Sequence, residues 1–139
     1  MIVNSAYMYM GKKEPEPPKN ELWTNGKLNY QFTILSGNAS FDSANNRLLI
    51  AAGSSINFTG LDFSNYNTIT IKYRKPASLS YSSCRFKFVL PDGSTYGGGT
   101  TTVKTETDTV TFSITNKTAT AINLRPSTYN IYVDSVIWN

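Results

Sequence analysis

The side chains that usually carry out acid–base and nucleophilic catalysis are scarce in this chain. It has no histidine, one cysteine (Cys84) and nine Asp and Glu residues among 139 positions. Without histidine, a Ser-His-Asp triad, a Cys-His pair and a histidine metal site are all excluded. A glycosidase needs two carboxyl groups that converge across a cleft, whereas Glu106 and Asp108 fall at the entry to a strand, where we expect solvent. We therefore predict no catalytic residue, no enzyme activity and no cofactor.

Aromatic rings are the second set of side chains with useful chemistry. They make up 13% of the chain, and a flat ring can stack on a sugar while amides and carboxylates supply hydrogen bonds. Four rings fall in loops or outside the apolar alternation described below, and we predict them as ligand-binding residues: Trp23, Tyr66, Tyr81 and Tyr96. For Trp23 and Tyr66 the alternative is that they close the ends of the core, because large rings are mostly buried.

Charged groups are few, at 16% of residues with a net charge of +4. The densest basic cluster, at 72–75, is interpreted as the solvated edge of a strand, so we predict no nucleic-acid partner. The glycine-rich run at 96–99 lacks the lysine of a phosphate loop and is expected to be a flexible loop, which could still place Tyr96 beside a ligand. Asp62 is expected to cap a turn and Asp134 to satisfy backbone groups at a bulge, so no metal site is predicted.

These side chains must be positioned by β-strands, because apolar residues recur at every second position. The alternation covers these segments: 28–34, 48–50, 69–73, 84–90, 110–114, 122–124 and 129–133. Cys84 shares the parity of Phe86 and Phe88, which predicts a buried structural thiol. The apolar phase slips after Asp134 and Ser135, which predicts a β-bulge.

Turn residues separate these segments at short intervals. Pro91-Asp92-Gly93 is typical of a hairpin turn, and Asn25-Gly26 and Asn45-Asn46 are further breaks. About eight short strands with one apolar face each are typical of antiparallel sheets packed face to face. We predict an all-β fold, an antiparallel β-sandwich, over residues 21–139.

Residues 1–20 are predicted to be a separate extended arm. A short strand-like segment precedes three prolines at 15, 17 and 18, which cannot join a ladder and favour a stiff linker. The arm is too short to bury its own apolar side chains, so we predict that they anchor a partner: Ile2, Val3, Tyr7, Met8, Tyr9 and Met10. The start lacks the basic and apolar regions of a signal peptide, and no segment is long enough for a membrane span.

Two segments carry a family resemblance. Residues 60–71 read GLDFSNYNTITI and residues 130–136 read NIYVDSV. The first resembles the entry into a central strand, and the second resembles the closing strand, of jelly-roll domains of the carbohydrate-binding-module and galactose-binding-like kind and of jelly-roll modules in phage minor structural proteins. The resemblance implies a jelly roll that binds or decorates, and such domains sometimes hold a structural Ca²⁺ at aspartates, although nothing in this sequence specifies one.

The segment at 6–13 is similar to N-terminal attachment segments of small phage virion proteins. From this resemblance we expect a non-enzymatic virion accessory protein, in capsid decoration or in a tail or fibre, made in the host cytoplasm. Its arm would bind other virion proteins by strand addition, and its domain could bind cell-surface glycans. A homo-oligomer is possible, and no membrane partner is expected. The alternative is a stand-alone carbohydrate-binding module.

Overall fold

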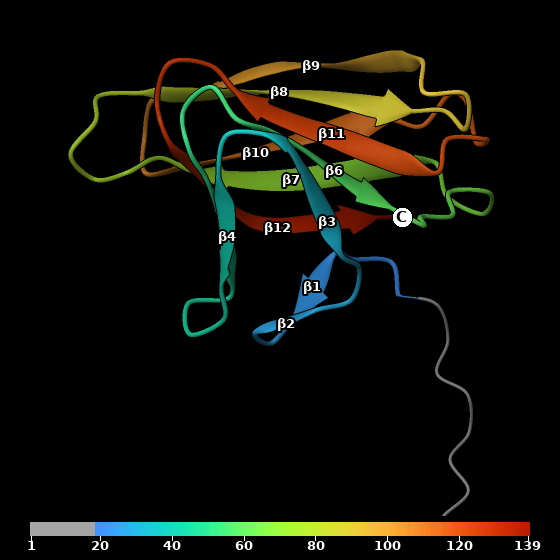
Figure 1. Cartoon of the computed structure of the whole chain (residues 1–139), viewed down its shortest axis with the longest axis horizontal. Helices are drawn as coiled ribbons and strands as arrows, with labels where there is room; N and C mark the ends of the chain where they lie inside the picture. Colours follow the sequence, from blue (N-terminus) through green and yellow to red (C-terminus); the bar gives the residue numbers. More distant parts are fainter. Residues whose placement is uncertain (1–18) are drawn as a thin grey trace, which may run out of the picture.

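Residues 19–139 are described by a computed structural model, in which they form β-strands joined by turns and loops (Figure 1). Within this range no helix is long and apolar enough to cross a membrane. The strands build two sheets of five strands each, stacked face to face, and one two-stranded hairpin. Neighbouring strands in both sheets are antiparallel, which confirms the predicted all-β sandwich.

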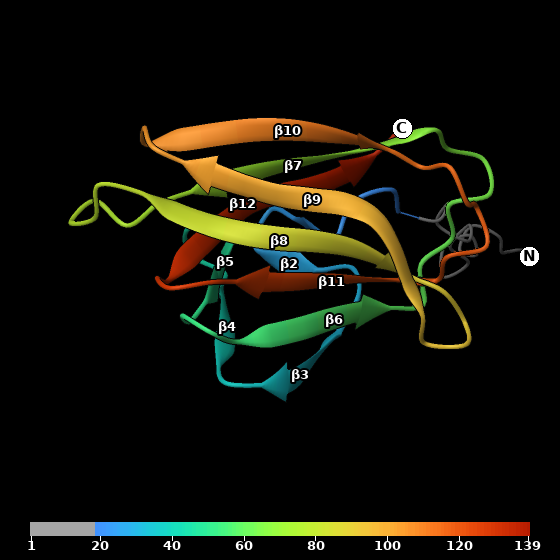
Figure 2. The ribbon, with the colours of Figure 1, turned by 90° about the horizontal axis from the view of Figure 1, so that it is seen from above.

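We name each sheet after its longest-paired inner strand. The β8 sheet, which faces the viewer in Figure 2, has the order β3 (Phe32–Ser36), β6 (Ser55–Thr59), β11 (Ala121–Pro126), β8 (Ser82–Val89), β9 (Thr95–Val103). The β7 sheet has the order β10 (Thr107–Ser113), β7 (Thr68–Arg74), β12 (Ile131–Trp138), β5 (Arg47–Ile50), β4 (Ala39–Asp42). The hairpin pairs β1 (Trp23–Thr24) with β2 (Lys27–Leu28) around Asn25-Gly26.

The core lies between the two sheets, because each inner strand turns alternate side chains inward. In β8 the buried residues are Cys84, Phe86 and Phe88, and in β7 they are Ile69, Ile71 and Tyr73. The predicted burial of Cys84 is therefore confirmed. Each fully buried aliphatic or aromatic side chain contributes about 1.5–3 kcal/mol to the free energy of unfolding, so these strands hold the outward-facing positions in fixed register.

The glycine run at 96–99 differs from its prediction as a flexible loop, because it belongs to strand β9. The ladder between β8 and β9 shifts register between Phe86 and Phe88, which marks a β-bulge. Gly98 adopts a φ of +76°, and a Cβ there would overlap the carbonyl oxygen of Phe86. Glycine is thus required to keep β9 on the sheet at the bulge.

Two further predictions about the strands have opposite outcomes. The bulge after Asp134 is confirmed, because the pairing of β12 with β7 shifts between Val133 and Ser135. The interpretation of residues 72–75 as a strand edge is wrong, because β7 lies between β10 and β12. Its cation Arg74 is instead held by the carboxylates of Asp134, at 3.0 Å, and Glu106, at 2.6 Å. The carboxylate of Asp134 therefore binds a side chain and not the backbone groups that we predicted for it.

Residues next to the predicted arm pack on the sandwich. The Asn20 side-chain amide donates to the Trp138 carbonyl at 2.8 Å, and the Trp138 N–H donates to the Asn20 carbonyl at 2.8 Å. The Tyr30 hydroxyl donates to the Lys19 carbonyl at 2.7 Å. The six apolar residues predicted to anchor a partner, at positions 2–10, lie outside the described residues.

Candidate ligand-binding face

Three of the four rings predicted to bind a ligand pack inward. Trp23 is 3% exposed, and its indole N–H donates to the carbonyls of Asn46 and Asp134 at 3.1 and 3.2 Å. Tyr66 is half-buried and lies edge-on to Trp138. Trp23 therefore presents no face to a ligand in this structure, and Trp23 and Tyr66 have the positions expected from the alternative interpretation, in which they close the core.

Tyr96 also has a packing role. Its ring stacks on Phe88 with centroids 5.0 Å apart, and its hydroxyl donates to the Asn116 carbonyl and accepts from the Asn116 N–H. Burial raises the pKa of the Tyr96 hydroxyl above its usual value. This ring joins the β8–β9 bulge to the loop that follows β10, and it is only partly exposed.

Tyr81 is the predicted ring that lies on the surface, and it has a partner that the sequence interpretation missed. Tyr81 is 40% exposed and Tyr129 is 36% exposed, and the two rings meet edge-on with centroids 5.3 Å apart. The sequence pattern predicts Tyr129 at the head of the last strand, but β12 begins at Ile131. Tyr129 therefore belongs to the β11–β12 loop, next to the β7–β8 loop that carries Tyr81.

Behind this pair, matched side chains continue along β8 and β11 on the outer face of the β8 sheet. The hydroxyls of Ser83 and Ser127 are 2.6 Å apart. Arg85 then lies directly opposite Arg125, and Lys87 lies opposite Asn123. These positions face outward because Cys84, Phe86 and Leu124 fill the core-facing positions between them. We call this series of pairs the β8–β11 ladder: Tyr81/Tyr129, Ser83/Ser127, Arg85/Arg125 and Lys87/Asn123.

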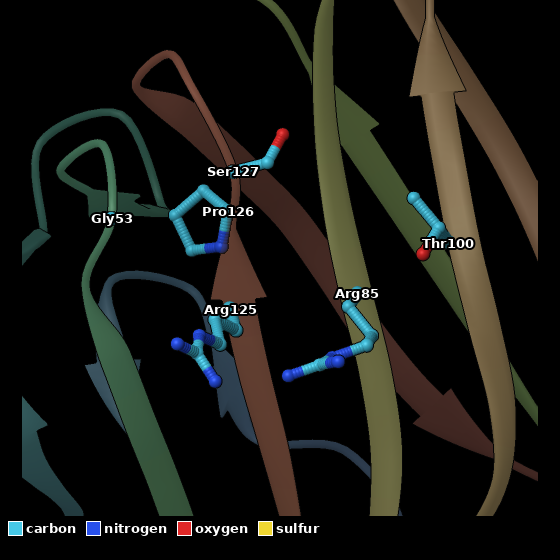
Figure 3. Close-up of a pocket in the computed structure, with 6 residues that line it drawn as sticks. All are labelled: Gly53, Arg85, Thr100, Arg125, Pro126 and Ser127. Carbon is cyan, nitrogen blue, oxygen red and sulfur yellow. The ribbon is translucent and has the colours of Figure 1, made fainter.

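The ladder borders a pocket of about 470 Å³ on the same face (Figure 3). Its lining residues come from β8, β9, β11, the start of the β11–β12 loop and the β5–β6 loop: Gly53, Arg85, Thr100, Arg125, Pro126 and Ser127. Figure 3 shows the Arg85 side chain extending from β8 towards β11, on the same side of the sheet as Arg125. Pockets of this volume accept small ligands or part of a larger one.

A cluster of hydrogen-bonded polar side chains lies next to the ladder on this face. The side-chain nitrogen of Asn123 lies 2.9 Å from the Ser55 hydroxyl and 2.8 Å from the side-chain oxygen of Asn57. Both partners lie on β6, the next strand of the sheet. Asn123 thus bonds to β6 on one side and lies opposite Lys87 of β8 on the other. The pairing of these strands therefore fixes the positions of the polar groups on this face.

The charges of this face are of one sign. Across the described chain, the five strands of the β8 sheet contain no Asp or Glu, whereas Arg85, Lys87 and Arg125 all project from its outer face. Neither of the two guanidinium groups has an ion-pair or hydrogen-bond partner among residues 19–139. This face therefore offers two cationic donor groups, side by side, to an acceptor from outside.

The aspartate predicted to cap a turn does so. Asp62 accepts hydrogen bonds from the N–H and the hydroxyl of Ser64 at 2.9 and 2.7 Å, and these bonds lower the pKa of its carboxyl group. Among residues 19–139, no three His, Cys, Asp or Glu side chains come together as they would to hold a metal ion.

Solved structures with a similar fold include carbohydrate-binding modules. A mutant of a family 29 carbohydrate binding module has a TM-score of 0.64 at 9% identity, over 85% of this chain and 89% of that chain. A family 6 carbohydrate-binding module has a TM-score of 0.57 at 18% identity, over 89% and 98%. PfGH50B has a TM-score of 0.60 at 12% identity, over 79% of this chain and 22% of that chain.

Neither the known protein-family models nor the curated protein sequences contain a match to this chain. The likeness to solved structures is thus one of fold. It confirms the jelly-roll β-sandwich expected from the segments at 60–71 and 130–136, and the resemblance to carbohydrate-binding modules. A shared fold does not by itself assign a ligand, so function must be argued from the face itself.

Proposed function

We propose that this protein is a non-catalytic glycan-binding module that holds its ligand on the outer face of the β8 sheet. The observation that carries the proposal is the β8–β11 ladder, which joins an exposed aromatic pair to hydroxyl, guanidinium and amide groups beside a pocket. Aromatic faces bind the apolar faces of sugar rings, and polar groups at fixed positions bind their hydroxyls. The likeness of the fold to carbohydrate-binding modules supports the proposal.

The length of the ladder suits an extended ligand. Arg85 follows Tyr81 by four positions, which corresponds to about 13 Å along a strand. A bound chain could therefore contact the tyrosine pair with one unit and the arginine pair with another. A short oligosaccharide would bury more of this face than a single sugar, so we expect affinity to rise with ligand length.

The first experiment is binding of the whole chain to a broad glycan panel, followed by titration of the best ligand against Tyr81→Ala and Tyr129→Ala. Each substitution removes one stacking surface, worth about 1 kcal/mol, so we expect roughly fivefold weaker binding. Tyr132→Ala is the control, because Tyr132 lies on the β7 sheet beneath Arg47 and away from the ladder. Thermal unfolding of each variant shows that it is folded.

Two results would contradict the proposal. The first is a failure of the whole chain to bind any glycan of the panel. The second is binding that Tyr132→Ala weakens as much as Tyr81→Ala does. Trp23→Ala and Tyr96→Ala would be poor probes of binding, because both rings pack inside and their removal would first lower the free energy of unfolding.

The placement of the protein in a phage virion stays a prediction from the sequence of residues 1–20. Its six anchoring residues lie outside the described residues. A glycan-binding domain is compatible with that placement, since a virion component can bind the host surface. We propose mass spectrometry of purified phage particles as the test of this prediction. Absence of the chain from the particles would contradict it.

A further inference from the structure

We infer that the ligand of this face is an acidic glycan, whose carboxylate or sulfate groups are bound between Arg85 and Arg125. This inference rests on the proposed function and names the class of glycan. An arginine fork donates parallel N–H groups that match the oxygens of a carboxylate or sulfate. Two such forks on adjacent strands can hold one anionic group from both sides.

Without such a ligand, repulsion between the two arginines lowers the free energy of unfolding. They are direct cross-strand partners, and like charges at opposite positions of a sheet are destabilising. A neighbouring carboxylate would offset this repulsion, because opposite charges attract. No such relief exists among residues 19–139, because the five strands of the β8 sheet lack Asp and Glu.

The β7 sheet shows how the same chain treats its other arginines. Arg74 is bound by Asp134 and Glu106, and Arg47 lies 3.8 Å from Asp42 and over the ring of Tyr132. Within the described residues, every arginine of the β7 sheet thus has a carboxylate partner, whereas neither arginine of the β8 sheet has one. The contrast separates a structural use of arginine from an open binding position.

The surroundings of the arginines favour a glycan over a nucleic acid. A single-stranded nucleic acid needs rings spaced along a basic groove so that successive bases can stack. Here the exposed rings, Tyr81 and Tyr129, stand together at one end of the ladder, and the remaining positions carry serine, arginine, lysine and asparagine. Hydroxyl and amide groups beside two cations suit a polyhydroxylated anion.

The test measures binding of the whole chain to four polymers in matched pairs. Polygalacturonate is compared with its carboxyl-reduced form, and dextran sulfate with dextran, so that the two pairs distinguish carboxylate from sulfate. The key variant is Arg85→Gln/Arg125→Gln. Hydrogen bonds to charged groups are strong, so we expect at least tenfold weaker binding of the acidic polymer.

A charge-matched variant provides the control. Lys27→Gln/Lys72→Gln also removes two positive charges, but Lys27 lies on β2 and Lys72 on β7, away from the ladder. We expect it to bind the acidic polymer within about twofold of the unchanged protein, since distant charges are screened by salt. A second readout is stability: removal of the like-charge pair should leave the thermal midpoint unchanged or slightly higher.

The possible outcomes separate this inference from the proposed function. Loss of acidic-polymer binding in the arginine variant alone supports both. Binding of neutral glycans with no preference for the acidic member of either pair overturns the inference and leaves glycan binding intact. Equal losses in both double variants, or tighter binding of single-stranded DNA than of either acidic polymer, overturn the inference. No binding of any glycan overturns both.

Discussion

At the scale of single residues, the Cys84 thiol is enclosed between the sheets beside Tyr73. Burial raises the pKa of the Cys84 thiol to about 12. Since the thiolate is the reactive form, we expect iodoacetamide at about pH 8 to leave Cys84 unmodified in the folded protein. In guanidinium chloride the thiol pKa returns to about 8.5 and labelling should be complete. Mass spectrometry of the two samples checks this, and rapid labelling of the folded chain would contradict it.

The candidate ligand residues were predictable only in part, because contacts between distant residues decide which aromatic rings are exposed. The alternation of apolar residues separates the two faces of a strand. It does not say which aromatic side chain near the end of a strand turns towards solvent. Tyr81 precedes β8 and Tyr96 lies near the start of β9, yet Tyr96 packs inward on Phe88 and bonds to Asn116, while Tyr81 stays exposed. Those contacts join residues distant in sequence, so no local pattern indicates them.

The arginine pair shows the same limit. Arg85 and Arg125 are forty positions apart, and only the register of β8 with β11 brings them opposite each other. A sequence pattern can place each residue on the outer face of its own strand. It cannot say which strands become neighbours, so the sequence alone does not show that these two arginines lie side by side on one face.

At the scale of strands, the β8–β9 bulge makes a sharp prediction about glycine. Gly98 and Gly60 have φ values of +76° and +77°, but a Cβ at Gly60 meets nothing within 4 Å, whereas one at Gly98 overlaps the Phe86 carbonyl. Gly60→Ala should therefore lower the free energy of unfolding by about 1 kcal/mol, through backbone strain alone. Gly98→Ala should lower it by at least about 3 kcal/mol.

Urea denaturation of both variants measures the difference. Equal losses in the two proteins would show that the backbone at the bulge can shift at little cost and would refute the steric argument. The bulge also explains why the glycine run was misinterpreted. A run of glycines is typical of loops, and its place within a strand depends on the backbone of the neighbouring strand, which the local sequence does not contain.

The strongly alternating strands were predictable because their apolar side chains face a single core. The segments at 69–73, 84–90 and 110–114 all fall within observed strands or extend one residue beyond them. The shorter strands β1, β2 and β4 carry too few alternating residues to give a signal, whereas β6 alternates Ile56 and Phe58 and was missed. These strands depend on pairing with longer neighbours.

At the scale of the whole molecule, the boundary of the packed domain can be tested by two truncations. The backbone and side chain of Asn20 bind Trp138, and the carbonyl of Lys19 accepts from Tyr30. A chain lacking residues 1–20 should therefore be less stable than one lacking residues 1–18, by about 1–2 kcal/mol for the lost hydrogen bonds. Chemical denaturation of the two truncated chains gives the difference directly.

The shorter truncation is also the cleaner way to test the predicted anchoring role of the arm. It removes all six predicted anchoring residues and keeps Lys19 and Asn20. Equal stability of the two truncated chains would show that Asn20 adds nothing to the sandwich, and either truncation could then serve. Particle association can be interpreted only for a truncated chain whose thermal midpoint is close to that of the full chain.

The two ends of the described chain meet at one end of the sandwich, where Asn20 bonds to Trp138. The loops that carry Tyr81 and Tyr129 lie at the opposite end, as Figures 1 and 2 show. A fluorophore, a biotin or a sensor surface attached after Asn139 would therefore point the tyrosine pair away from the attachment. The domain could thus be immobilised in a single orientation, and the glycan panel could be passed over a surface on which every ladder is accessible.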